Sequence, residues 1–535
     1  MINYGLYGFN TINVNGTDTN KLFSIYGNDL VNVDTGLGYK LNIPTSNYSS
    51  SVTNRKFSMV SFLGRCFLFS NVMQPISYNG TNWLRDFTPQ NACPWGSIAK
   101  SYKERIYLAD TIIPYMNYDL TNPGYYKSRI FYSDLPVNDK LTWGIGIIQP
   151  DGPVLFPSEN LITSGLIQRA YFKSNRIKVG DPLYIPFANN TNANLGAYTV
   201  SEVVDEYKIR ITEKFPNSSD SDFAFWVGSN WFDVNTDDND YITALEENNN
   251  RLIIFKNDSL YRYDTSSLVK VKNVPGTTSK DSVINIKDYT IYFHGSNKEK
   301  TGFYLYDGVT SQRISNAIQP FIEGILAANY TNVVAWREGD VYRAYVGNID
   351  NTNSSNPAYN ISKTNTIFSY NVPNNEWRID TCNHVIKAAT TMRESNAEKI
   401  FVQDDSGKVF QMNYGNSFSG ANIPFKLETQ PYYPRGSEIM SRFTRVKIVS
   451  RDARGVSVSY KLWDTPLAVD SEYHGLGDIE DDTTEFLIPT EHCLGCGIQL
   501  MFSESGITEP NYHIEKISIY HDSDITVTPE RKDQR

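Results

Sequence analysis

Residues 250–264 read NRLIIFKNDSLYRYD and predict a single tight β-hairpin. The apolar run Leu252–Phe255 forms one expected strand, and Leu260, Tyr261 and Tyr263 belong to the return strand. The polar segment Lys256–Ser259 supplies the turn between them. Runs of β-branched and aromatic residues around a short Asn/Asp turn are typical of hairpins. Comparable pieces recur along the chain, and this recurrence predicts its architecture.

Six units of this kind each end in an anchor residue, which an Asn or Asp follows within two positions. The anchor residues are Tyr78, Tyr132, Tyr263, Tyr306, Tyr370 and Met412. The steps from Tyr263 to Tyr306 and from Tyr370 to Met412 lie near the ~40–50 residues of a four-stranded propeller blade. The chain is therefore predicted to be all-β, with a degenerate β-propeller of about six blades over residues 51–144 and 235–420.

The step from Tyr132 to Tyr263 is too long for one blade and contains a segment of different character. Residues 145–234 hold several short apolar runs around polar turns, one of them at residues 179–182. Several short strands in a small segment are typical of a barrel of the SH3 or OB type. We therefore expect a small β-barrel inserted at residues 145–234.

The two ends of the chain differ from the repeat. Residues 1–50 are rich in Asn, Gly and Thr and predict an extended N-terminal arm, either a terminal strand with loops or a contact to a neighbouring subunit. Alternating apolar and polar residues predict a C-terminal antiparallel β-sandwich over residues 421–525. Residues 526–535 are expected to be a charged tail. The clearest predicted helix covers Asn316–Ala327.

Composition restricts the classes of function. The chain is 13% aromatic, which excludes a disordered protein, and its net charge of −10 lacks the basic balance of a protein that grips nucleic acid. Such charge would suit a surface that DNA passes without binding. Five scattered cysteines argue against a disulfide framework. The start of the chain lacks a signal-peptide pattern, and no apolar run approaches the roughly 20 residues of a membrane span, so we expect synthesis in a cytoplasm and no membrane role.

Two motifs could hold a metal ion. Cys493 and Cys496, preceded by His492, have zinc-knuckle spacing, but a structural zinc site needs four ligands and Cys382 with His384 is the only other local pairing. Two cysteines at strand ends are the simpler interpretation. We predict no metal-binding residues.

An acidic segment begins like a calcium loop. Asp233, Asn235 and Asp237 match its first ligand positions, but its glycine and glutamate positions hold other residues. A looser cation site at Asp237, Asp238 and Asp240 and a solvated acidic linker both stay open.

One basic segment stands out near the C-terminus. It could meet an acidic partner surface or DNA, or it could simply be solvated. It consists of Arg442, Arg445, Lys447, Arg451 and Arg454. No nucleophile elbow, zinc-protease motif or phosphate-binding glycine loop occurs, so we predict no catalytic or cofactor-binding residues, no cofactor and no enzyme.

Several stretches carry a resemblance to a known family: GLYGFNT and VNVDTGLGYKL near the start, then ITALEENNNRLIIFKNDSLYRYD, YLYDGVTSQRISNAIQPFIEGI and SRFTRVKIVSRDARGVSVSYKLWD. The chain resembles the tail nozzle, or tail hub, proteins of short-tailed bacteriophages, which include the tail tubular protein B, packaged-DNA stabilisation and crAss-like muzzle types. The resemblance implies a structural virion protein in the tail, assembled in the host cytoplasm. Six copies would form a ring below the portal and adaptor proteins. The ring would wall and close the DNA exit channel, with a part in genome retention and ejection.

Two other functions fit the same pattern. A carbohydrate-binding propeller or receptor-binding tail protein could stack Tyr78, Trp83 and Trp377 on sugars. A glycan hydrolase would require two carboxylates that converge in the central pocket of the propeller.

Overall fold

The computed structural model comprises two compact units, residues 1–412 and 413–535. It describes residues 4–12, 18–41, 57–80, 83–84, 94–112, 125–136, 141, 143, 145–148, 155–156, 160–163, 172–173, 177–188, 196–214, 223–227, 230–296, 300–351, 361–394, 397–412, 417–418, 421–422, 425–436, 438–465, 468–469, 472–504 and 513–522. No helix within these ranges is long and apolar enough to cross a membrane.

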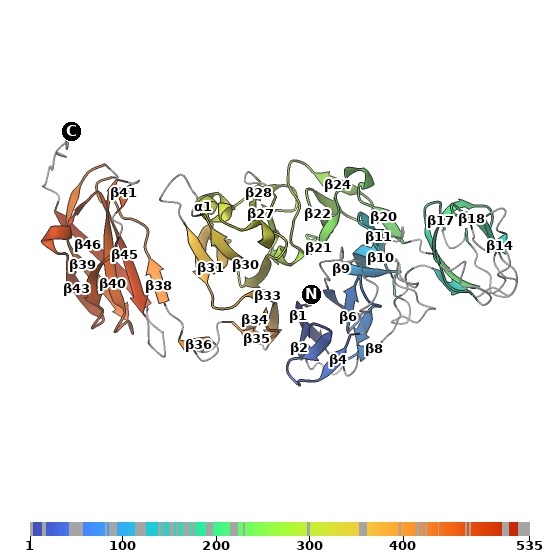
Figure 1. Ribbon diagram of the computed structural model, residues 1–535, viewed down its shortest axis with the longest axis horizontal. Coiled ribbons are helices and arrows are strands. Elements are labelled where there is room, and N and C mark those ends of the chain that lie inside the picture. The colour runs from blue at the N-terminus through green and yellow to red at the C-terminus, as the bar shows by residue number, and fades with distance from the viewer. Residues whose placement is uncertain are drawn as a thin grey trace. The chain divides into compact units, whose positions relative to one another are not determined.

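The described residues of the first unit form eight antiparallel sheets, and we number the seven that are not part of the insertion as blades 1 to 7 in chain order (Figure 1). Blade 1 is β1 (Tyr4–Ile12), β2 (Asp18–Tyr26), β3 (Asp29–Asn32) and β4 (Gly38–Lys40); blade 2 is β5 (Phe57–Phe62), β6 (Arg65–Ser70), β7 (Ile76–Tyr78) and β8 (Trp83–Leu84); blade 3 is β9 (Trp95–Tyr102), β10 (Arg105–Ile112), β11 (Tyr125–Tyr126), β12 (Arg129–Tyr132) and β20 (Trp231–Asp233). Blade 4 is β21 (Ile242–Asn248), β22 (Arg251–Lys256), β23 (Leu260–Tyr263) and β24 (Leu268–Val271); blade 5 is β25 (Ile284–Ile286), β26 (Tyr289–His294), β27 (Gly302–Tyr306) and β28 (Ser311–Arg313). Blade 6 is β29 (Val334–Glu338), β30 (Val341–Asp350), β31 (Ser362–Asn371) and β32 (Glu376–Thr381); blade 7 is β33 (Ile386–Glu394), β34 (Ala397–Asp404) and β35 (Val409–Gln411).

The first strands of the blades contact one another in a closed cycle. β1 contacts β5, β5 contacts β9, and β9 contacts β21. β21 meets the 3-10 turn Lys280–Ser282 before β25, β25 meets β29, and β29 meets β33. β33 packs beside β1, which closes the ring (Figure 1). The all-β propeller is confirmed, with seven blades where the anchor residues indicated about six.

The additional blade comes from the predicted arm. The expectation of an extended N-terminal arm is wrong for residues 4–12 and 18–41, whose strands pair as the four-stranded sheet of blade 1. Its apolar side chains, such as Leu6, Phe9 and Phe23, are buried against both neighbouring blades. The blade escaped detection because β3 ends in Asn32 with no anchor tyrosine before the turn that contains Asp34.

The hairpin at residues 250–264 is confirmed as β22 and β23, which pair Leu252 with Tyr263 and Ile254 with Tyr261. The tight turn before it uses Asn249 and Asn250, whose φ angles of 49° and 58° are the left-handed conformation of a type I′ turn.

Tyr78, Tyr263 and Tyr306 end the third strands of their blades and fix the following turns. They donate their hydroxyl groups to the carbonyls of Gly80, Thr265 and Gly308 at 2.8, 3.3 and 2.7 Å. In blade 5, the Asp307 carboxylate then accepts the amide hydrogens of Val309 and Thr310. The repeated Tyr-Asx pair is therefore a local turn device.

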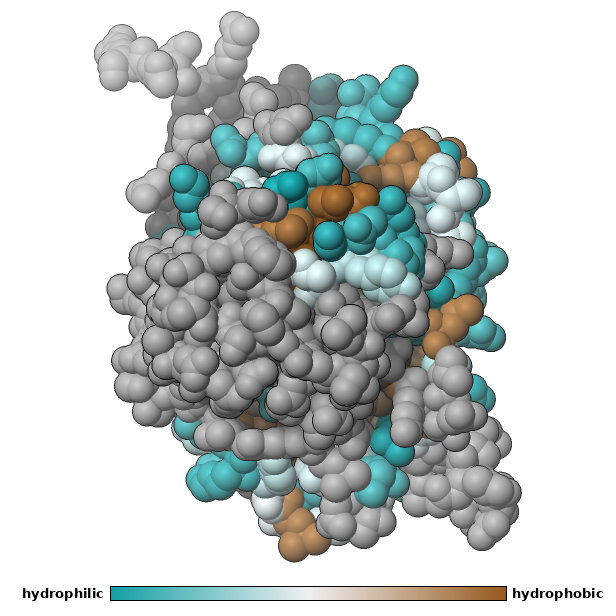
Figure 2. All heavy atoms as spheres, turned by 90° about the vertical axis from the view of Figure 1, so that its right-hand side faces the viewer, coloured by the Kyte–Doolittle hydropathy of each residue, from teal (hydrophilic) through white to brown (hydrophobic). Residues whose placement is uncertain are grey.

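The predicted insertion is a seven-stranded sheet that leaves blade 3 after β12 and returns at β20. Its strands are β13 (Ile145–Ile148), β14 (Leu155–Phe156), β15 (Leu161–Thr163), β16 (Pro182–Ala188), β17 (Gly196–Val203), β18 (Lys208–Ile211) and β19 (Phe223–Val227). Because β20 pairs with β12, residues 231–233 belong to the blade and the predicted end at 234 is a few residues too late. On the face in Figure 2, the described side chains are mostly hydrophilic, with some hydrophobic ones among them.

The second unit holds two antiparallel sheets around one apolar core that includes Phe443, Val446, Tyr460 and Phe502. One sheet is β38 (Phe425–Glu428), β45 (Gly497–Glu504), β40 (Ser457–Thr465), β41 (Ala468–Val469) and β42 (His474–Asp478); the other is β43 (Thr483–Leu487), β39 (Ser441–Arg451), β44 (Leu494–Gly495) and β46 (His513–Asp522); the short pair β36 (Ser417–Phe418) and β37 (Ala421–Asn422) precedes them. The C-terminal sandwich is confirmed. The predicted tail at 526–535 lies outside the described residues.

The predicted helix over Asn316–Ala327 is wrong in length. α1 covers only Gln319–Glu323, between the 3-10 turns Ser315–Ile318 and Ala327–Asn329; two further 3-10 turns are Thr236–Asp238 and Thr490–His492. Ile325 instead forms a β-bridge with Ile349, and the Ile349 side chain packs on Gly324. Tertiary packing therefore ends the helix after little more than one turn.

Candidate functional site

A cavity of about 700 Å³ lies where the innermost segments of all seven blades meet. Its walls come from β1, β5, β9, β21, β29 and β33 and from the turn that enters β25. Ligand pockets in proteins commonly measure about 300–1,000 Å³. The cavity is therefore the candidate site of the propeller.

Glu246 on β21 is the most buried carboxylate of this cavity, with its side chain 17% exposed. Lys100 on β9 forms an ion pair with Glu246, and the Asn285 amide on β25 donates to the same carboxylate at 3.0 Å. Glu246 therefore connects blades 3, 4 and 5.

Lys280 makes a contact across the cavity. Its ammonium group on blade 5 donates to the carbonyl of Phe57 and to the hydroxyl of Ser58, 3.1 Å away, on blade 2. The Tyr7 hydroxyl of blade 1 donates to the same Phe57 carbonyl at 2.8 Å, and burial holds the pKa of Tyr7 well above its ordinary value. Because blades 2 and 5 are not neighbours in the ring, Lys280 ties opposite sides of the propeller together.

Among the described residues, the cavity is lined by two carboxylates, Glu246 and Asp281, and by three lysines, Lys100, Lys280 and Lys387. The Asp281 carboxylate lies 3.9 Å from the ammonium of Lys280. Both carboxylates therefore neighbour an ammonium group, and the polar groups of the cavity join blades to one another. The sequence gives no motif for this set, because the residues become neighbours only when the ring closes.

The structure places Arg442, Arg445, Lys447 and Arg451 on β39, and Arg454 in the turn that follows it. Arg445 pairs with Glu485 at 2.8 Å and lies over the Tyr520 ring at 4.0 Å. Arg451 pairs with Glu515 at 2.6 Å. The predicted basic strand is real, but acidic neighbours offset part of its charge.

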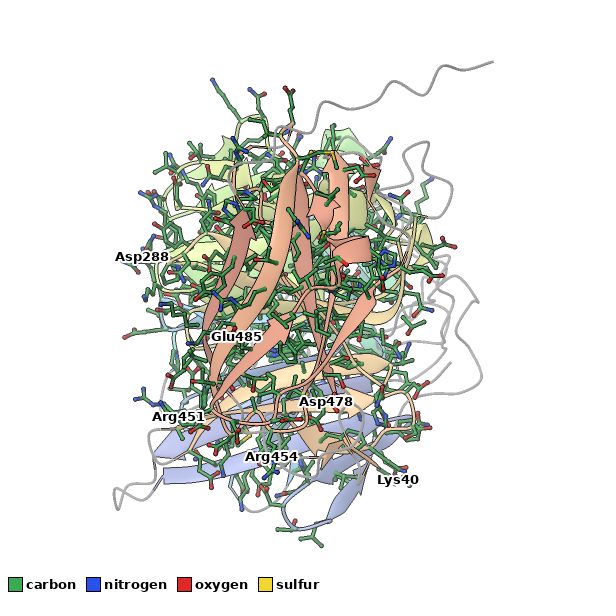
Figure 3. All side chains as sticks on the ribbon, turned by 90° about the vertical axis from the view of Figure 1, so that its left-hand side faces the viewer. Lys40, Asp288, Arg451, Arg454, Asp478 and Glu485 are labelled. Carbon is green, nitrogen blue, oxygen red and sulfur yellow. The ribbon has the colours of Figure 1, made fainter. Side chains whose placement is uncertain are left out.

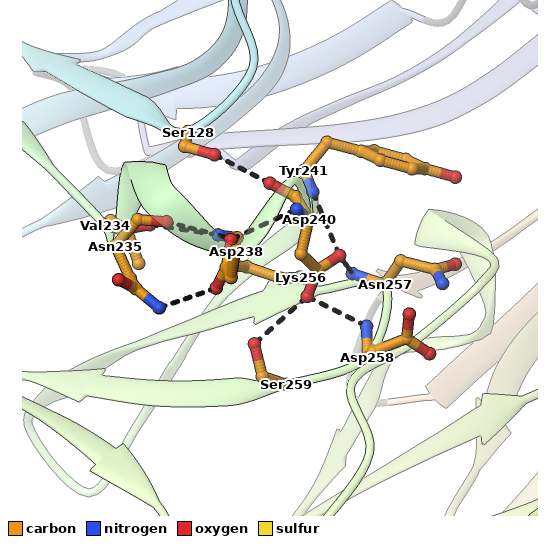
Figure 4. A network of polar contacts seen from close by, with 10 residues as sticks. All are labelled: Ser128, Val234, Asn235, Asp238, Asp240, Tyr241, Lys256, Asn257, Asp258 and Ser259. Atoms are coloured by element: carbon orange, nitrogen blue, oxygen red, sulfur yellow. Dashed lines mark hydrogen bonds and ion pairs between the residues drawn. The ribbon is translucent and has the colours of Figure 1, made fainter.

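The acidic segment at residues 233–240 surrounds an internal cation (Figure 4). The fully buried ammonium of Lys256 donates to the carbonyls of Val234 and Asn235 at 3.1 and 2.8 Å and to the Asp238 carboxylate at 2.5 Å. Burial acts to raise the pKa of Asp238, but the hydrogen bonds from Lys256 and from the Asp240 amide outweigh it and lower the pKa. Lys256 therefore takes the place that a loosely bound metal ion would need.

The carboxylate of Asp240 is also hydrogen-bonded within the protein. It accepts the amide hydrogens of Asn257 and Asp258 at 2.9 and 3.1 Å and the hydroxyl hydrogen of Ser259 at 3.1 Å. The described part of the segment is thus a linker between β20 and β21 that internal hydrogen bonds hold in place, and its residues Asn235, Thr236, Asp238 and Asn239 are exposed to solvent. The side chain of Asp237 lies outside the described residues.

The cysteine motifs form local hydrogen bonds. The Cys493 thiol donates to the Thr490 carbonyl and the Cys382 thiol to the His384 carbonyl, both at 3.1 Å. Within the described ranges, no three His, Cys, Asp or Glu side chains group as metal ligands would.

The aromatic residues considered for sugar stacking pack inside blades. Tyr78 is 6% exposed and Trp83 packs against it with ring centroids 5.3 Å apart. Trp377 packs on Tyr370 at 4.8 Å and donates its indole hydrogen to the Ile314 carbonyl at 2.9 Å. Tyr78 is therefore buried within its blade, whereas Trp83 and Trp377 are half-buried and these contacts cover only part of each ring.

The chain matches no protein-family model and no curated protein. Among solved structures, it is similar to a phage phi92 endosialidase with a TM-score of 0.23 and 11% identity, over 65% of this chain and 50% of that chain. It is also similar to an exo-beta-1,3-galactanase from Phanerochaete chrysosporium (TM-score 0.16, 10% identity, 79% and 95% covered) and to an arabinoxylan arabinofuranohydrolase from Bacillus subtilis (TM-score 0.18, 9% identity, 82% and 97% covered). The chain spans about half the length of the endosialidase that it matches. These values carry no inference about activity.

Proposed function

We propose that this protein is a non-enzymatic structural subunit of a short bacteriophage tail. Copies of the chain form a ring at the distal part of the tail, six being the expected number. The ring walls and closes the DNA exit channel and takes part in genome retention and ejection. Its partners are further copies, the portal and adaptor ring proteins and other tail proteins, and viral DNA passes without tight binding.

The observation that carries the proposal is that charged side chains in the central cavity bond one blade to another. The Lys100–Glu246 pair joins neighbouring blades, and Lys280 joins blades 2 and 5. These groups therefore serve the rigidity of the propeller. A propeller whose blades are tied together in this way suits a building block that must keep its shape under load.

The charge of the chain supports the same function. A net charge of −10 repels the phosphates of DNA, so a ring wall of this composition would let DNA slide.

Imaging and mass measurement of the purified full chain test the proposal. Negative-stain images should show symmetric rings, and mass photometry should show a defined multiple of the 60.8 kDa chain, with six expected. A strictly monomeric particle at high concentration, with or without the adaptor ring, would contradict the proposal.

A glycan-binding or glycan-cleaving propeller is the second candidate, and the presence of Glu246 and Asp281 in one cavity is the observation that favours it. The measurement is turnover and binding on a glycan panel, with Glu246→Gln and Asp281→Asn as variants. Activity that the wild type shows and both variants lose would replace the structural proposal. Equal, background-level signals from all three chains are expected.

A further inference from the structure

One face of the C-terminal sandwich combines exposed leucines with arginines. On the outer side of the β39 sheet, Arg445 lies directly between Leu487 on β43 and Tyr520 on β46, and Arg442 lies beside Leu494 on β44. Leu487 is 76% exposed, Leu494 41% and Tyr520 38%. We call these five residues the Arg–Leu patch.

The chemistry of this patch is that of a protein contact. Arg and Tyr are enriched at the centres of protein interfaces and among their energetic hot spots. Glu485 and the Tyr520 ring already hold the Arg445 guanidinium in place, so little conformational entropy remains to be lost on binding. The patch is therefore preorganised, and its leucines gain from being covered.

An acidic loop lies near the other end of β39. The exposed residues Asp478, at the end of β42, and Glu480, Asp481 and Asp482, between β42 and β43, lie next to the turn that follows Arg451. Hydrogen bonds from Ser450 to the Asp482 carbonyl and from Gly455 to the Ile479 carbonyl, each 2.8 Å, fix the loop on the sandwich. Arg454 is exposed there too, but the carboxylates outnumber it.

The loop and the patch cannot meet within one sandwich. Arg451 lies six residue steps beyond Arg445 on β39, which corresponds to about 20 Å along a strand. Figure 3 shows Arg451, Arg454 and Asp478 toward one end of the sheet, with Glu485 farther along it. The arginines of one copy can therefore meet the acidic loop only of another copy. Contacts of this kind, between different surfaces of identical subunits, generate a ring when the rotation from copy to copy closes.

We propose that the Arg–Leu patch binds the acidic loop, residues 478–482, of a second copy of this chain. The inference rests on the proposed ring function and assigns the subunit contact within it. The leucines would supply the apolar centre, and Arg442 and Arg445 would meet the carboxylates of the neighbour.

Leu487→Asp tests the contact because this side chain is too exposed to contribute to folding. The charge would face the acidic loop of the next copy, so the dissociation constant of assembly should rise at least ~10-fold by mass photometry. Leu37→Asp is the matched control, since Leu37 is 74% exposed on blade 1. It should assemble as the wild type does.

Charge reversal on the loop provides a rescue. In the double variant Leu487→Asp/Asp481→Lys, the new aspartate faces a lysine on the neighbour, and assembly should recover by at least ~3-fold relative to Leu487→Asp. Circular dichroism melting should be the same for all four chains. If the wild type assembles and Leu487→Asp assembles equally well, the contact is overturned while the ring stands. If the wild type stays monomeric, the ring itself is overturned.

Discussion

Two interfaces in the propeller close the same ring by different means. Between blades 5 and 6, sixteen buried residues of the described chain form one apolar core, in which Phe303 packs against the rings of Phe293, Tyr342 and Phe368. Between blades 7 and 1, the corresponding core has three buried residues, Leu6, Leu22 and Met392. We call the second of these the closing interface.

Hydrogen bonds compensate at the closing interface. The Gln403 side chain on blade 7 accepts the amide hydrogen of Gly5 at 3.2 Å and donates to Ser24 and to the Ile25 carbonyl at 2.8 and 2.9 Å on blade 1. The Thr390 hydroxyl accepts the Gly8 amide hydrogen at 3.2 Å. Apolar burial has no direction, whereas hydrogen bonds have one. Where no short connection links the two blades, directional bonds set their register.

The largest effect is expected at the interface between blades 5 and 6. Phe303→Ala should lower the free energy of unfolding by about 3–5 kcal/mol, because the cavity it leaves is enclosed by rings on three strands. Urea unfolding followed by tryptophan fluorescence measures the change. A loss below about 1 kcal/mol would show that this core is not what holds the two blades together.

Among changes to polar side chains, Gln403→Met should have the largest effect. It should lower the free energy of unfolding by about 2–4 kcal/mol, because several buried groups of blade 1 lose their hydrogen-bond partners. Hydrogen exchange should accelerate for the amides of β1 and β2 and leave those of β26 and β27 protected. Gln312→Met is the control, since Gln312 is exposed on β28 of blade 5. Uniform acceleration in all blades would mean that the ring opens globally and the closing interface is not its weak point.

A third interface joins the inserted sheet to blade 3 and predicts that the stability of the protein depends on pH. Trp231 donates its indole hydrogen to Asp181 at 2.7 Å, and burial raises the pKa of this carboxyl to about 6, against an ordinary value of 3.8. The folded state therefore binds the proton more tightly than the unfolded state, so stability should fall by about 2–3 kcal/mol as the pH rises from about 4 to about 6.

Asp181→Asn is the variant for that dependence. Its thermal unfolding should lose the Asp181 part of the slope between pH 4 and 6, while the slope below pH 3.5 stays unchanged. An identical pH profile for the wild type and the variant would contradict the assigned pKa.

The smallest effect concerns close packing at the closing interface. A Cβ on Gly8 would lie 2.3 Å from Cγ of Met392, so Gly8→Ala should lower the free energy of unfolding by about 1–2 kcal/mol. In a Met392→Ala background the same change should cost nothing measurable, as a double-mutant cycle would show. Gly38→Ala is the control, because a Cβ there meets only Val31 at 3.9 Å. Additive costs would exclude the contact between Gly8 and Met392 as the cause.

Much of the fold could be predicted from local patterns. The six anchor residues, five tyrosines and Met412, each marked one blade because the turn chemistry beside them is local, as the 2.7 Å bond from Tyr306 to the Gly308 carbonyl illustrates. Blade 1 lacks that device, so its strands read as an arm. The helix at residues 316–327 was overestimated because the contact between Gly324 and Ile349 involves a strand that follows later in the chain.

The sequence by itself determined the all-β class, the hairpins, the place of the insertion and the terminal sandwich, because period-2 patterns and turn residues act over a few positions. Only the tertiary structure decided the seventh blade, the closing interface and the cavity. Gln403 and Gly5, or Lys280 and Phe57, lie hundreds of positions apart, so their contacts exist only once the ring has closed. Likewise, the acidic segment resembles a metal-binding loop in sequence, but in the structure the ammonium group of Lys256, from the next hairpin, binds to the Asp238 carboxylate.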